Sequence, residues 1–74
     1  MSCFSKKNIL DYWNNILSIC QYACDINDIC MLESSYHLLL DIKIKCEELY
    51  VDRYSEQLHI PEKITMKCAS LDIN

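Results

Sequence analysis

The sequence predicts an all-α protein: an antiparallel two-helix hairpin over about 5–24 and 29–58, with a short C-terminal tail or third helix after Pro61. Two observations predict this fold. The chain has no glycine and only one proline, so nothing ahead of Pro61 is a strong helix breaker. Apolar residues also recur at intervals of three and four over two long stretches, as they do on one face of a helix. With 74 residues, we expect a single helical-hairpin module, 1–74, with a small core.

The first predicted helix begins at Ser5, whose hydroxyl suits an N-cap. Its polar residues share one narrow stripe: Asp11, Asn14, Asn15, Ser18, Gln21 and Asp25. The central apolar seam comprises Ile9, Trp13, Ile16, Cys20 and Ala23, flanked by Leu10, Leu17 and Cys24 on one side and by Tyr12 and Ile19 on the other. This apolar arc is wider than one neighbouring helix covers. We therefore expect the first helix to contact more than one element.

The segment from Asp25 to Asp28 is the one polar cluster ahead of residue 60 that can turn the chain. Asparagine and aspartate bond to nearby backbone and tolerate left-handed conformations. Asn27 or Asp28 can then cap the second helix, although a later start at Ser34 or Ser35 is an alternative.

The second predicted helix has its apolar seam at Leu32, Tyr36, Leu39, Ile42, Cys46, Leu49 and Tyr50. Its opposite face is polar, and Asp41 and Lys45 form a favourable i,i+4 pair there, worth about 0.2–0.5 kcal/mol. Pro61 ends this helix, because the residue before a proline avoids the α region.

The tail after Pro61 has two interpretations. As a helix with the proline at its first position, it would place Ile64, Cys68 and Leu71 on one face. As a strand, it would place Ile64, Met66 and Cys68 on one face.

Charge and composition narrow the classes of function. The net charge is −4, from 7 Lys+Arg against 11 Asp+Glu, and an acidic surface repels phosphate backbones, so we expect no nucleic-acid binding. Apolar runs such as Leu38–Leu40 are far too short to span a bilayer. Asp11, Asn14 and Asn15 interrupt any signal-peptide apolar region, so we expect an intracellular chain whose partner is a protein.

Six cysteines, Cys3, Cys20, Cys24, Cys30, Cys46 and Cys68, are the most suggestive chemical feature. The nine residues between Cys20 and Cys30 are typical of oxidised helical hairpins, but the second matching pair is missing. A zinc site using Cys20 and Cys24 would need two further ligands. Because free cysteine is a small apolar residue that is usually buried, we expect reduced thiols in the core and no metal. A thiol-redox or metal-binding hairpin of viral or organellar type is the alternative.

Enzymatic activity is not expected, and no cofactor is. His37 and His59 are the only imidazoles, and nothing in the sequence places either beside a nucleophilic thiol. Without glycine there is also no phosphate-binding loop. Aromatic and apolar residues are what protein interfaces use. We expect the partner interface to involve Leu10, Trp13, Leu17, Cys20, Cys24, Leu39, Ile42, Cys46, Leu49, Tyr50 and Tyr54.

Part of the second predicted helix resembles a known family. Residues 36–42 read YHLLLDI, followed by CEEL at 46–49 and by Tyr50 and Tyr54. This stretch of about 20 residues is similar to the second helix of the small co-chaperones of type III secretion needles. The resemblance implies a two-helix hairpin that pairs with a tetratricopeptide-repeat-like chaperone, through its helical groove. Together the two proteins would hold the needle subunit unpolymerised in the bacterial cytoplasm.

Overall fold

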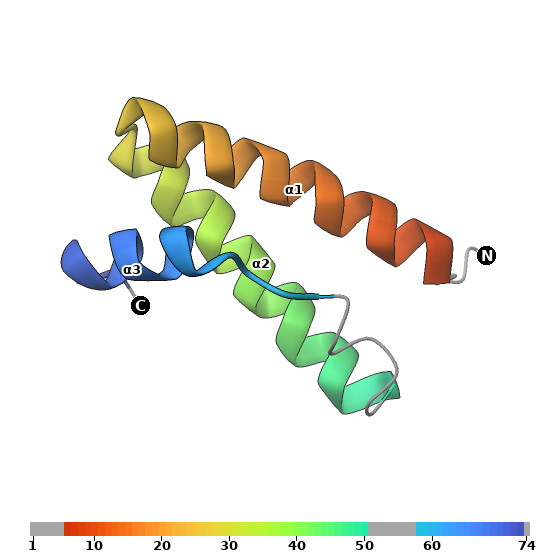
Figure 1. Ribbon diagram of the computed structural model, residues 1–74. Helices are drawn as coiled ribbons and strands as arrows, with labels where there is room; N and C mark the ends of the chain where they lie inside the picture. The colour runs from red at the N-terminus through yellow and green to blue at the C-terminus, as the bar shows by residue number, and fades with distance from the viewer. Residues whose placement is uncertain (1–5, 51–57, 74) are drawn as a thin grey trace.

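The computed structural model describes residues 6–50 and 58–73, and these form three helices: α1 (Lys6–Ile26), α2 (Ile29–Tyr50) and α3 (Glu62–Ser70). The first two run antiparallel as a hairpin, and α3 lies across it near the turn (Figure 1). The predicted all-α hairpin with a third helix is therefore confirmed. No strand occurs among the described residues, so the strand interpretation of the tail is wrong.

The helix ends differ slightly from those predicted. The first helix continues two residues beyond the predicted end, to Ile26, and the second begins at residue 29 as predicted rather than at Ser34 or Ser35. The predicted continuation of α2 falls on residues 51–57 and the predicted cap falls on Ser5, all of which lie outside the described residues. Leu58, where the second helix was predicted to end, is a bend.

The turn between α1 and α2 contains no glycine. Asn27 has a left-handed backbone conformation, with φ of 60°, which asparagine adopts more readily than most residues. The Asp28 N–H then donates to the Ala23 carbonyl at 3.0 Å. The Asp28 carboxylate accepts from the Met31 N–H at 3.1 Å, so Asp28 is the N-cap of α2. One asparagine and one aspartate thus end one helix and start the next, as the polar cluster predicted.

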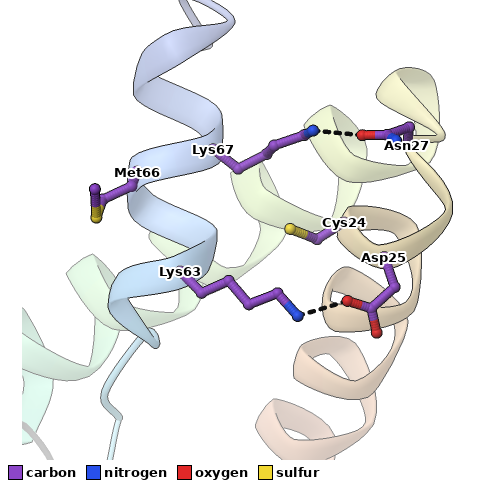
Figure 2. Close-up of a pocket in the computed structure, with 6 residues that line it drawn as sticks. All are labelled: Cys24, Asp25, Asn27, Lys63, Met66 and Lys67. Carbon is purple, nitrogen blue, oxygen red and sulfur yellow. Dashed lines mark hydrogen bonds and ion pairs between the residues drawn. The ribbon is translucent and has the colours of Figure 1, made fainter.

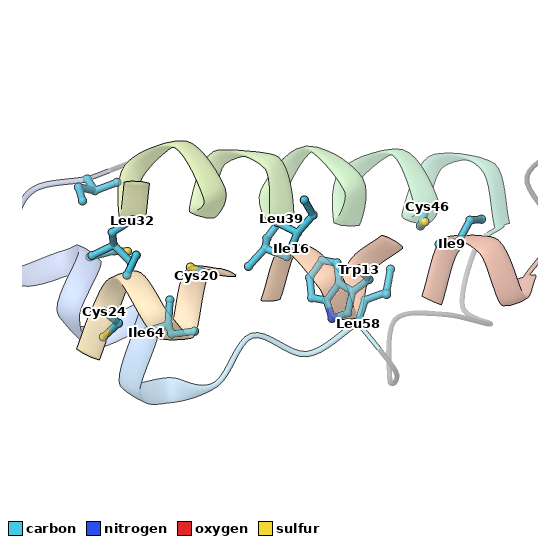
Figure 3. Packing of buried hydrophobic residues seen from close by; sticks show 13 residues of the cluster. Ile9, Trp13, Ile16, Cys20, Cys24, Leu32, Leu39, Cys46, Leu58 and Ile64 are labelled. Atoms are coloured by element: carbon cyan, nitrogen blue, oxygen red, sulfur yellow. The ribbon is translucent and has the colours of Figure 1, made fainter. Parts of the chain in front are cut away.

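The hydrophobic core lies between the two long helices and is closed by the C-terminal segment. All five seam residues predicted for the first helix are buried, with Trp13 only 1% exposed. Leu58 and Ile64 reach this core from the C-terminal segment, and Figure 3 shows Leu58 beside Trp13. The first helix therefore contacts both α2 and α3, which confirms that its apolar arc is too wide for one neighbour.

The short third helix differs in detail from the expectation. Pro61 is its N-cap rather than its first helical residue. Ile64 and Cys68 are buried as predicted, but placing Leu71 on the same face was wrong, because the helix ends at Ser70 and Leu71 is 38% exposed. The backbone of Asp72 is left-handed, with φ of 62°. This reversal brings Ile73, rather than Leu71, into the core.

Candidate functional site

Most residues predicted to contact a partner belong to the chain's own core. Trp13, Cys20, Cys24, Leu39 and Cys46 are buried between the helices, and Leu10, Leu17 and Ile42 are half-buried against them. Leu49 and Tyr50 lie at the end of α2, where only the backbone is described, and Tyr54 lies outside the described residues. The structure thus brings the two apolar seams together inside one molecule.

A different set of large apolar side chains remains exposed. Tyr12, Ile19 and Ile26 follow one another at intervals of seven residues along α1, and Met31 and Leu38 do the same on α2. Their exposed fractions range from 36% for Met31 to 48% for Tyr12 and Ile26. We call these five residues the open face.

Helix geometry places the open face on one side of the hairpin. Tyr12 and Ile19 each directly precede a buried seam residue of α1, and Met31 and Leu38 each directly precede one of α2. One residue back along a helix is a rotation of about 100°. Because the two helices face each other and run in opposite directions, this rotation leads to the same side of the pair. The exposed apolar side chains of both helices therefore lie on the same side of the hairpin.

The third helix lies on the other side. Cys24, which directly follows a seam residue of α1, turns its sulfur toward α3 between Lys63 and Lys67 (Figure 2). Lys63 forms an ion pair with Asp25, with 2.6 Å between Nζ and Oδ1, and Lys67 donates to the side-chain oxygen of Asn27. The hydrogen bond and the charge of Asp25 raise the pKa of Lys63. Thus α3 covers one side of the hairpin and leaves the open face uncovered.

A shallow hollow of about 590 Å³ separates α3 from the end of α1. It is lined by Cys24, Asp25, Asn27, Lys63, Met66 and Lys67. Both ammonium groups are already bonded to α1 or the turn. The hollow is therefore lined by the Cys24 side chain and by two lysines whose ammonium groups already have partners.

Three of the buried core residues are cysteines of α1 and α3. Cys20 and Cys24 lie one turn apart on α1, and Cys68 belongs to the buried face of α3. Burial raises the pKa of Cys68 to about 11, with contributions from Cys20 and Cys24. Burial also raises the pKa of Cys20, although its hydrogen bond with Ser35 opposes this effect.

The described cysteines, Cys20, Cys24, Cys30, Cys46 and Cys68, are free, and all but Cys30 are buried. Over residues 6–50 and 58–73, no three or more His, Cys, Asp or Glu side chains form a group able to hold a metal ion. In the same part of the chain, no helix combines the length and the apolar character needed to cross a membrane.

The residues that sequence reasoning missed carry a recognisable signal. None of the five open-face residues belonged to the predicted interface, yet each is exposed: Tyr12, Ile19, Ile26, Met31 and Leu38. They repeat every seven residues along each helix, as seam residues do, but four of them stand directly before a seam residue. That position places them beside the core rather than within it. Ser35 was also missed: it is buried between Leu32 and Leu39 on the seam of α2, and its hydroxyl donates to the carbonyls of Met31 and Leu32.

Comparisons of this chain with protein-family models, with curated proteins and with solved structures give no match.

Proposed function

We propose that this chain is a non-enzymatic binding module whose open face receives a helix of a protein partner. One observation carries the proposal: five large apolar side chains line a single side of the hairpin and stay in contact with water. Exposed apolar side chains gathered on one side of a small protein mark interaction sites. Two rows at helical spacing also suit an amphipathic helix laid along them.

The resemblance to needle co-chaperones gives the proposal its specific form. In that form the chain pairs with a helical-repeat chaperone, and the pair keeps a needle subunit unpolymerised in the bacterial cytoplasm. The acidic balance, a net charge of −4, supports a protein partner over a nucleic acid. The contacts that we propose are those of the open face, in place of the seam residues that are buried in the core.

Affinity capture from the source organism tests this proposal. The variants Ile19→Asp and Leu38→Asp place a charge on the open face, while Gln21→Asp and His37→Asp place the same charge at exposed positions of α1 and α2 outside it. We expect the tagged wild-type chain and the two control variants to retain the same partners, identified by mass spectrometry. We expect both open-face variants to lose them.

The same experiment separates the general proposal from its specific form. Capture of a helical-repeat chaperone and a filament-forming subunit supports the co-chaperone role, whereas capture of unrelated proteins through the open face contradicts that role alone. Equal capture by wild type and by Ile19→Asp would contradict the binding module itself. Circular dichroism of each variant establishes that the helices are intact.

A further inference from the structure

We propose that residues 61–73, which comprise α3, its N-cap and the turn that follows it, are a cap that opens and closes on the hairpin while α1 and α2 stay folded together. This inference goes beyond the proposed binding function. It concerns the side of the hairpin that α3 covers, and none of the residues of the cap belongs to the open face.

The backbone of the cap is bonded only to itself. The N–H groups of Ile64 and Thr65 donate to the Pro61 carbonyl, and those of Asp72 and Ile73 donate to carbonyls of α3. Among the described residues, no backbone hydrogen bond joins the cap to α1 or α2. The cap can therefore leave the hairpin without breaking a backbone hydrogen bond of either long helix.

Side chains alone hold the cap in place. Three of its apolar side chains are buried in the core: Ile64, Cys68 and Ile73. The polar contacts of Lys63 and Lys67 with the end of α1 and the turn are exposed to solvent, and such pairs contribute little stability. The helix α3 also touches α1 through far fewer residues than α2 does. Detaching the cap therefore costs much less free energy than separating α1 from α2.

The cap does not keep its helix once it leaves the hairpin. The helix α3 has nine residues, and isolated helices shorter than about 12–15 residues are only marginally stable in water. Docking and folding of the cap are therefore one event. Segments with few buried apolar contacts open as local units at a lower free energy than the rest of a protein.

Opening changes which residues the hairpin exposes. In the closed form Cys68 is completely buried and Cys24 is 7% exposed. Figure 2 shows the Cys24 side chain pointing toward α3, so the open form uncovers this part of α1. The buried side chains of the cap become accessible in the same step. The cap thus controls whether this side of α1 is buried or exposed.

Native-state hydrogen exchange of the full chain tests the proposal. Under reducing conditions, NMR spectroscopy follows the exchange of each amide at increasing, sub-denaturing concentrations of guanidinium chloride. Relative to their unstructured rates, we expect the amides of 66–73 to exchange at least about tenfold faster than those in the middle of α1 and α2. Their exchange should also depend less on the denaturant, because local opening exposes less surface than global unfolding. Equal protection and equal denaturant dependence in all three helices would overturn the proposal.

Three variants separate opening of the cap from unfolding of the hairpin. Ile9 is buried beside Cys46, at the end of the hairpin away from Ile64 (Figure 3). We expect Ile9→Ala to speed exchange in α1 and α2 but to leave exchange of the cap unchanged, because the hairpin stays folded in the open form. Ile64→Ala should speed exchange of the cap at least about tenfold. Met66→Ala, at an exposed position of the same helix, should change it little.

Alkylation of Cys68 by iodoacetamide gives a second readout. This thiol is completely buried, so the reagent reaches it only in the open form or in the unfolded chain. Cleavage after Lys67 releases the peptide that carries Cys68, and its mass over time gives the alkylation rate. We expect this rate to rise at least about tenfold in Ile64→Ala and to stay unchanged in Ile9→Ala. An equal rise in both variants would show that Cys68 is exposed only when the whole chain unfolds, which contradicts the cap.

Discussion

Single side chains show which apolar residues hold the fold and which remain available. Trp13 and Tyr12 are neighbours in sequence, yet Trp13 is 1% exposed and Tyr12 is 48% exposed. The difference follows from their positions relative to the seam of α1. Trp13 points between the helices toward Leu58, while Tyr12 lies at the edge of the open face.

This contrast predicts two very different costs of truncation. We expect Trp13→Ala to lower the free energy of unfolding by about 3–5 kcal/mol, because it removes a large buried ring and leaves a cavity. Tyr12→Ala should change it by no more than about 0.5 kcal/mol, as at most surface positions. Urea unfolding followed by circular dichroism measures both. Similar losses in the two variants would contradict the described core.

The buried thiol of Cys68 predicts a loss of stability at alkaline pH. Its pKa is raised from an ordinary value of 9.0 to about 11, chiefly by burial. The folded chain therefore keeps a proton that the unfolded chain releases, and this contribution to stability is fully present below pH 9.0 and is lost as the pH rises toward about 11. Burial also raises the pKa of Cys20 and Cys46, so the thiols act in the same direction.

Thermal unfolding under reducing conditions over this pH range checks the effect. We expect Cys68→Ala to make the alkaline decline shallower but not to abolish it, and Cys30→Ala, which alters an exposed thiol, to leave it unchanged. An equally steep decline with and without Cys68 would show that this thiol is not buried as described.

Residue-level prediction from the sequence was accurate for the core and inaccurate for the surface. Periodicity locates the seam of α1 because burial and helical repeat coincide there. The same periodicity does not state how much of a wide apolar arc the rest of the chain covers. Trp13 and Leu39 were therefore predicted at a partner interface, although each is enclosed by the chain itself. The burial of Ser35 was missed because a serine is usually exposed. Here its hydroxyl is satisfied by hydrogen bonds to its own helix, which sequence periodicity does not reveal.

At the scale of elements, the helices follow from the absence of breakers, and their ends follow from local capping. The turn at Asn27 and Asp28 was predicted because their side chains suit a left-handed residue and an N-cap. The end of α3 was not predicted. Asp72 adopts a left-handed backbone conformation that brings Ile73 into the core, and no glycine is present there to signal such a turn in the sequence. Neither the position of α3 nor its contact with Cys24 follows from periodicity alone, since both depend on packing between segments far apart in sequence.

The docking of α3 should depend on its apolar face rather than on its ion pair. Ile64 is 1% exposed, so we expect Ile64→Ala to cost about 2–5 kcal/mol of unfolding free energy. The Lys63–Asp25 pair is solvated on both sides, so Lys63→Ala should change stability little, and added salt should not release α3. Chemical denaturation of the two variants at low and high salt compares these contributions. A larger loss from Lys63→Ala than from Ile64→Ala would contradict this order.

At the scale of the whole molecule, the two sides of the hairpin differ. One side receives α3, which encloses Cys20 and Cys68. The other side retains the open face, which none of the three described helices covers. Part of the wide apolar arc that the sequence predicts for the first helix is thus covered by α3, and the rest stays exposed. This division is a property of the assembled fold.

Sedimentation velocity of the purified chain over a range of concentrations tests the open face most directly. In the absence of other proteins, the wild-type chain should self-associate as its concentration rises, because the exposed apolar side chains of two copies then bury each other. Ile19→Asp should remain monomeric with the same helicity, and Gln21→Asp should associate like the wild type. A wild-type chain that stays a sharply melting monomer at every concentration would contradict the account, as would undiminished association of Ile19→Asp.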